Sequence, residues 1–151
     1  MKIRLKLVLY FVWSTFNGSV CVAAEGVQTS VQRGEDLFYG RTEVNGKLYL
    51  HNRTLGSPYV RCVNCHHVED QPKSSKLNTN ENSFGPLLGA HFIQTPNNSR
   101  GGPVRSYEPE SFCKMLRSGM DPSQILIRTD MPRYILTDDD CNALWSFLMA
   151  H

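Results

Sequence analysis

The 151-residue sequence lacks a long apolar run, an excess of one charge and internal repeats. Its formal net charge is only +2 and no cluster of like charges is present, which argues against nucleic-acid binding. Segments that alternate apolar and polar residues, as strands do, are not prominent, so we expect a mainly α protein. The 40% hydrophobic and 20% charged residues fit one small globular domain and argue against a wholly disordered chain.

The start of the chain has the layout of a secretory signal peptide. Three cations within the first six residues precede an apolar segment, Leu7–Phe16, and a small-residue segment that ends in Val22-Ala23-Ala24. The apolar segment is too short for a membrane span, which needs about 20 residues. We therefore expect residues 1–24 to be removed on export, leaving a mature domain at 25–151 with no stable membrane span. A retained anchor and a lipoprotein attached at Cys21 are the alternatives.

Removal of this signal would change the charge and the cysteine count. The remaining 127 residues carry 13 basic and 14 acidic side chains, a net charge of −1. Four of the five cysteines stay, in a periplasmic compartment where disulfides persist. The basic character of the whole chain therefore belongs to the export signal.

Three segments have helical signals. Ser30–Gly40 begins at a capping serine and ends at a glycine. Pro109–Ser118 has proline at its first position and is followed by Gly119. The clearest helix is capped by Thr137. The three aspartates that follow Thr137 face the positive end of the helix dipole. Its apolar residues recur at helical spacing: Cys141, Leu144, Trp145 and Leu148.

We expect loops between these helices. Gln71–Asn82 and Thr95–Pro103 are rich in polar and turn-forming residues, and Arg41–Arg61 has no clear periodicity. Within the last of these, Asn45-Gly46 between short apolar runs predicts a small hairpin.

The segment Cys62-Val63-Asn64-Cys65-His66 carries the chemistry. On one helical turn, two thiols three positions apart can reach the vinyl groups of one haem, and the adjacent imidazole can face the iron. The motif is therefore typical of c-type haem attachment. It also fits a redox dithiol, for which a βαβ context would be expected, or half of a zinc site. Further zinc ligands could come from Cys113, Cys141 or His91.

With this motif, the chain resembles the class I c-type cytochromes over most of the mature domain. The segments that carry the resemblance are Gly34 with Phe38, the Cys62–His66 motif, Gly85-Pro86-Leu87-Leu88-Gly89, and Met131-Pro132 before a capped helix. The resemblance implies a small helical domain with long loops, wrapped around one covalently attached haem c. The chain departs from the family pattern in its long links before and after the motif.

The resemblance implies that His66 is the proximal iron ligand, Met131 the distal ligand and the Pro86 carbonyl an acceptor for the His66 ring. Met131 lies in an extended stretch, and its thioether would favour the reduced iron. The alternatives for the sixth position are Met120, a histidine such as His91, or no ligand. Met115 lies on the apolar face of its helix and is expected in the core.

The two remaining cysteines, Cys113 and Cys141, each lie on a predicted helix. Because the expected compartment is oxidising, we expect a disulfide between them. Two buried thiols that act as small apolar residues are the alternative.

These expectations converge on electron transfer. If both axial positions are filled, no position on the iron remains for a substrate. We expect a periplasmic electron carrier, not an enzyme, that works between an upstream dehydrogenase and a downstream cytochrome or oxidase. The long segments Arg41–Arg61 and Gln71–Asn82 are candidate docking surfaces. The alternative is a haem-based gas sensor, or a peroxidase-like protein, with an open sixth position.

Overall fold

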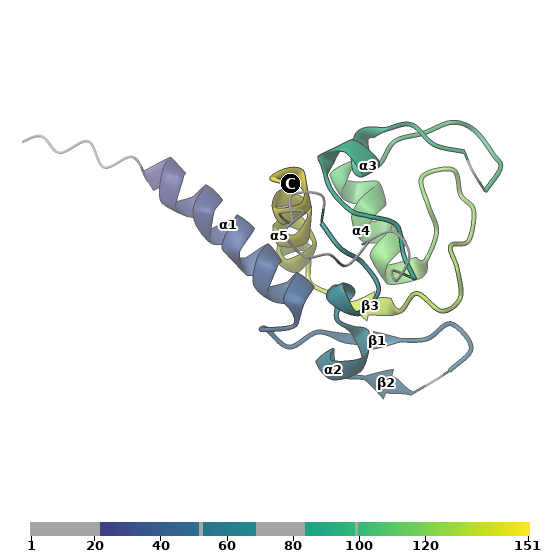
Figure 1. Cartoon of the computed structure of the whole chain (residues 1–151), viewed down its shortest axis with the longest axis horizontal. Coiled ribbons are helices and arrows are strands. Elements are labelled where there is room, and N and C mark those ends of the chain that lie inside the picture. The colour runs from purple at the N-terminus through teal and green to yellow at the C-terminus, as the bar shows by residue number, and fades with distance from the viewer. Residues whose placement is uncertain (1–21, 52, 69–83, 99) are drawn as a thin grey trace, which may run out of the picture.

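The computed structural model describes residues 22–51, 53–68, 84–98 and 100–151, and describes the side chains of the first helix from Ser30 onward. The elements assigned within these ranges are, in chain order, α1 (Val22–Tyr39), β1 (Asn45–Lys47), β2 (Thr54–Leu55), α2 (Ser57–Val60), the 3-10 helix η1 (Cys62–Asn64), α3 (Ala90–Gln94), α4 (Pro109–Ser118), β3 (Arg133–Ile135) and α5 (Asp138–Met149) (Figure 1).

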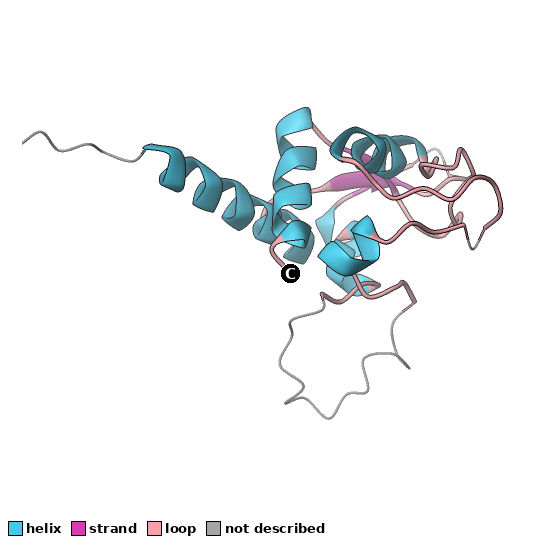
Figure 2. Cartoon of the chain, turned by 90° about the horizontal axis from the view of Figure 1, so that it is seen from above, coloured by secondary structure: helices cyan, strands magenta, loops and turns pink. Residues whose placement is uncertain are grey.

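The first and last helices pack across each other, with the start of α1 projecting beyond the rest of the fold (Figure 2). Gly34 allows this close crossing, because a Cβ there would overlap the carbonyl of Ala143 and lie 2.7 Å from the Cβ of Phe147. Phe38 packs its ring against Phe147, with centroids 5.4 Å apart. The crossing buries the apolar faces of both helices: Leu37, Phe38, Leu144, Phe147 and Leu148.

The helices predicted from capping signals are confirmed. α4 spans Pro109–Ser118 as predicted and ends at Gly119, whose φ of 77° lies in the left-handed region. α5 follows Thr137, whose hydroxyl accepts from the amide of Asp140. The first helix ends one residue before its predicted end but begins at Val22, eight residues earlier than predicted.

A three-stranded antiparallel sheet, in the order β2-β1-β3, corrects two predictions. Asn45-Gly46 lies inside β1 rather than at a hairpin turn, and Gly46 pairs with Leu55 on one side and Tyr134 on the other. A Cβ at Gly46 would lie 3.2 Å from the carbonyl oxygen of Arg133, so the glycine suits a crowded strand. The expected mainly α protein is therefore a helical structure with a small added sheet. The sheet left no alternating pattern in the sequence because its strands are only two or three residues long.

The segment Arg41–Arg61 is more ordered than predicted, since it supplies β1, β2 and α2. The Ser57 hydroxyl accepts from the Val44 amide at 2.6 Å and donates to the Val44 carbonyl at 3.2 Å, which ties α2 to the chain before β1. Because β1 pairs with β3, this segment holds the chain directly after Met131-Pro132.

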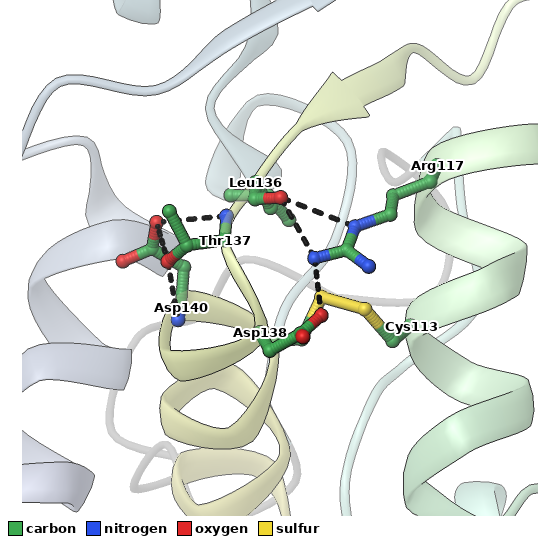
Figure 3. A network of polar contacts seen from close by, with 7 residues as sticks. Cys113, Arg117, Leu136, Thr137, Asp138 and Asp140 are labelled. Atoms are coloured by element: carbon green, nitrogen blue, oxygen red, sulfur yellow. Dashed lines mark hydrogen bonds and ion pairs between the residues drawn. A yellow bond between two sulfur atoms is a disulfide. The ribbon is translucent and has the colours of Figure 1, made fainter.

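A disulfide joins Cys113 of α4 to Cys141 of α5, with Cα atoms 5.4 Å apart (Figure 3). Beside it, Arg117 donates to the Leu136 carbonyl at 2.8 Å and pairs with the Asp138 carboxylate at 2.7 Å. These contacts tie the end of α4 to the start of α5.

Two predicted segments lie wholly or largely outside the described residues: the signal peptide up to residue 21, and the loop Gln71–Asn82. The backbone of α1 runs through the expected cleavage point after Ala24. Within the described ranges, no helix combines the length and the apolar character needed to cross a membrane.

Replacing Gly34 with valine should lower the free energy of unfolding by about 2–3 kcal/mol, because the new side chain would push α1 away from Ala143. Gln32, exposed on the same helix, is the matched control, and Gln32→Ala should change that free energy by less than ~0.5 kcal/mol. Denaturant unfolding measures both. Equal stability of the two variants would show that the helices do not cross at Gly34.

Replacing both Cys113 and Cys141 with alanine should lower the free energy of unfolding by about 2–4 kcal/mol, because the closed loop no longer restricts the unfolded chain. In the unreduced parent, mass spectrometry after alkylation under denaturing conditions should find neither residue labelled. Labelling of both would contradict the disulfide.

Candidate functional site

An apolar cavity lies among the helices and the segments that contain the predicted site residues. The cavity has a volume of about 70 Å³. Most of its wall is aliphatic or aromatic: Phe38, Leu88, Phe92, Ile93, Phe112, Met115, Leu116, Ile127, Leu144 and Leu148. Cys62, His66 and Met131 line the same cavity. The fold therefore brings together a thiol, an imidazole and a thioether from segments far apart in the sequence.

Backbone hydrogen bonds fold the C-x-x-C-H segment into one turn. The amides of Cys65 and His66 both donate to the Cys62 carbonyl, at 3.1 and 2.9 Å. The Asn64 side chain accepts from Arg61 at 2.7 Å and donates to a backbone carbonyl at 3.2 Å, which secures the start of the turn. Cys62 lines the cavity, and Cys65 is half-buried on the same turn without being part of the lining.

The environment of Cys62 does not favour thiolate chemistry. Burial raises the pKa of the Cys62 thiol to about 11, against the opposing effect of the Tyr134 hydroxyl 3.9 Å away. Tyr134 is itself buried and donates to the Val60 carbonyl at 2.8 Å. Redox dithiols and cysteine nucleophiles depend on a lowered thiol pKa. A thiol that stays protonated at neutral pH therefore argues against the redox-dithiol alternative.

The His66 ring is buried, and its Nδ1 lies 2.9 Å from the Pro86 carbonyl oxygen, the contact that the resemblance implies. A carbonyl can only accept, so Nδ1 carries the proton and Nε2 keeps its lone pair. Burial lowers the pKa of His66, an effect that His67 reinforces and the Pro86 carbonyl opposes. The imidazole is thus neutral and able to donate to a metal.

The segment after the motif is held against residues 85–88. The amide of Gly85 donates to the Cys65 carbonyl at 2.9 Å, and the amide of Leu88 donates to the His67 carbonyl at 2.8 Å. Gly85 lies so close to the His66 ring that a Cβ there would be 2.8 Å from Nε2 and nearer still to two other ring atoms. Only glycine leaves room for the imidazole at this position.

The candidate distal ligands do not share one location. Met131 is half-buried and lines the cavity, and Met115 lines it from the buried face of α4. Met120, whose backbone pairs with Leu126, is not part of the lining. His91 is exposed on α3. Of the candidates outside the core helix, Met131 alone lines the cavity together with His66.

The cavity has a polar end that no local sequence signal predicted. Arg100 and Tyr107 line both the apolar cavity and an adjoining pocket that includes Arg105 and Asp121. Arg100 pairs with the buried Asp121 carboxylate at 3.5 Å. Burial raises the pKa of Tyr107, the charge of Arg100 lowers it, and the charge of Asp121 raises it. The cavity therefore has an apolar body and a cationic end. Arg100 and Arg105 lie in segments without periodicity, so the sequence gave no local signal for this end.

The zinc alternative finds no support in the described part of the chain. Cys113 and Cys141 are bonded to each other, so neither is available as a thiolate ligand. No group of three His, Cys, Asp or Glu side chains within the described ranges is arranged to hold a metal ion. A structural zinc site needs four such donors.

Comparisons with known proteins add no family assignment. No protein-family profile matches the chain, and no curated protein or solved structure matches it significantly. The functional conclusion therefore rests on the geometry and chemistry of the site.

Replacing Gly85 with alanine should lower the free energy of unfolding by about 2–3 kcal/mol, because the methyl group would displace the His66 ring from the Pro86 carbonyl. Gly56 is the matched control, since a Cβ there meets atoms only at 3.8 Å and beyond. Gly56→Ala should cost less than ~1 kcal/mol. Denaturant unfolding of both variants checks the contact, and an unchanged Gly85→Ala would contradict it.

Proposed function

We propose that this protein is a periplasmic electron carrier with one haem c, attached through Cys62 and Cys65 and ligated by His66 and Met131. One observation carries the proposal. The imidazole of His66 and the thioether of Met131 line the same apolar cavity as Cys62, the first thiol of the C-x-x-C-H turn. Imidazole and thioether are the axial ligand pair of cytochromes c.

The residues present suit a haem in their chemistry. His66 is neutral, buried and oriented through Nδ1, as a ligand imidazole should be. The cavity volume of about 70 Å³ is too small for the whole group, so part of it would lie outside the cavity. One edge would then face solvent, which is the arrangement that transfer to a docked partner requires.

Cys62 and Cys65 would form the covalent attachment. Each thiol would add across one vinyl group: the S–H bond and the vinyl π bond would break, and a carbon–sulfur bond and a carbon–hydrogen bond would form. This addition needs no external oxidant or reductant.

Arg100 and Tyr107 would hold the polar edge of the cofactor. They stand where the apolar cavity meets the adjoining polar pocket, and a guanidinium and a phenol are both donors for carboxylates. The two propionates of a haem have this chemistry. The cavity would thus match both the apolar body and the anionic edge of the group.

Electron transfer follows from the ligand set. When bound, the haem supplies a one-electron Fe(III)/Fe(II) couple. Because His66 and Met131 would fill both axial positions, no position is left for a substrate. As a ligand, the thioether of Met131 would favour the reduced iron and raise the potential. The partners we propose are an upstream dehydrogenase and a downstream cytochrome or oxidase. Within Arg41–Arg61, the exposed side chains Tyr49, Leu50 and Tyr59 are candidates for contact with them.

The Met131→Ala variant tests the function at the ligand that closes the site. The reduced parent should be low-spin and resist carbon monoxide, whereas reduced Met131→Ala should bind it rapidly, because the sixth position becomes open. Absorption spectra before and after addition of the gas measure both. Met120→Ala is the matched control, since Met120 does not line the cavity, and should behave as the parent.

Two outcomes would contradict the proposal. Rapid binding of carbon monoxide by the parent would favour the gas-sensor or peroxidase-like alternative with an open position. A Met131→Ala variant with the parent's spectrum would show that another residue is the distal ligand.

A further inference from the structure

The backbone loop that carries Met131 is folded around the side chain of Arg133. Nη1 of Arg133 donates to the Met131 carbonyl at 2.6 Å and to the Arg128 carbonyl at 3.4 Å. Nη2 donates to the carbonyls of Ile127 and Arg128, both at 3.4 Å. Three carbonyls within five residues thus converge on one guanidinium, and the shortest of these hydrogen bonds ends on Met131 itself.

The place of this guanidinium is costly. Its Nε is buried with no hydrogen-bond partner, and burial of such a group without a partner is unfavourable. The ion pairs of the described residues do not include Arg133, so carbonyl oxygens rather than a carboxylate meet its charge. An apolar side chain at position 133 would avoid the cost of this unpartnered Nε, so packing alone does not explain an arginine there.

Two neighbours fix the guanidinium from outside the loop. Gly119 lies directly beneath it, and any Cβ at position 119 would overlap Nε and Cζ of Arg133. Tyr49 lies on the segment that follows β1, and the centroid of its ring is 5.7 Å from Cζ of Arg133. The backbone of Arg133 is itself held in β3, where it pairs with Lys47. The side chain therefore reaches from a paired strand back to the loop before it.

We propose that Arg133 is the positioning residue for the distal ligand: it holds the backbone of residues 127–131 so that the Met131 thioether faces the cavity. This inference rests on the proposed function, since it requires Met131 to bind the iron. Without the guanidinium, three carbonyls lose their common donor and the loop loses the contact that fixes Met131. The thioether then competes less well with external ligands for the iron.

Arg133→Met tests this role, because methionine keeps the length of the aliphatic stem and removes every donor. The affinity of the reduced protein for carbon monoxide should rise at least tenfold over the parent. Arg128→Met is the matched control: the same change in the same loop, at a side chain that is 70% exposed and pairs only with neighbouring Asp130. It should leave the affinity within about twofold of the parent, since the Arg128 carbonyl remains.

Met131→Ala, measured alongside, separates failure of the inference from failure of the proposed function. If Met131→Ala opens the iron and Arg133→Met does not, the positioning role is wrong while the ligand assignment stands. If Met131→Ala leaves the spectrum unchanged, the ligand assignment fails and the inference fails with it. If Arg128→Met opens the iron as much as Arg133→Met, the loop is sensitive to any change and Arg133 has no special role.

Arg133→Lys gives a second measurement in case Arg133→Met does not fold. Lysine keeps the charge but donates from a single point, so it cannot span carbonyls that the guanidinium fork reaches from two nitrogens. Imidazole should displace the native ligand from Arg133→Lys at a concentration several-fold lower than from the parent. Equal concentrations for the two proteins would overturn the positioning role.

Discussion

The backbone pairing of residues 65–68 with residues 85–88 is the contact on which the candidate site depends. It places Gly85 against the His66 ring and the Pro86 carbonyl at Nδ1, and it carries Leu88 into the wall of the cavity. The burial that results keeps the imidazole neutral, and the carbonyl fixes which nitrogen has the lone pair. The turn at Cys62–His66 and the segment that covers it therefore act as one unit, in which a displacement of Gly85 would reach His66 directly.

The segment around Met131 is held differently, by contacts that converge on it from several elements. The crossing of α1 and α5 at Gly34 brings Phe38 and Leu144 into the cavity wall, and the disulfide between Cys113 and Cys141 fixes α4 to α5. β3 begins two residues after Met131 and pairs with β1, so the segment 41–61 supports the loop that carries Met131. Because this segment contains β1, β2 and α2, its deletion would disrupt the fold. A role in partner docking is therefore better tested by substituting its exposed side chains.

Features with a strong local signal were predictable from the sequence. The C-x-x-C-H turn, the capped ends of α4 and α5, and Gly119 as a left-handed stop each depend on a few adjacent residues. The sheet was not predictable, because its strands are too short for periodicity and Asn45-Gly46 has the local chemistry of a turn. Arg100, Tyr107 and Arg133 were missed for a different reason: their roles depend on tertiary contacts with Asp121, Gly119 and the carbonyls near Met131. A weak signal existed for Gly85, which begins the Gly85–Gly89 segment of the resemblance, and for Tyr134, three residues after Met131.

The presence of a covalently bound haem is the central claim, and one measurement tests it most directly. The exported protein, denatured and extracted under conditions that remove non-covalent haem, is reduced and its absorption spectrum is recorded. The account predicts that one haem per chain stays with the polypeptide, and that it is lost when Cys62 and Cys65 are both replaced by serine. A protein that shows no haem absorption when produced with haem-attachment machinery, or whose haem is extracted on denaturation, would contradict the account.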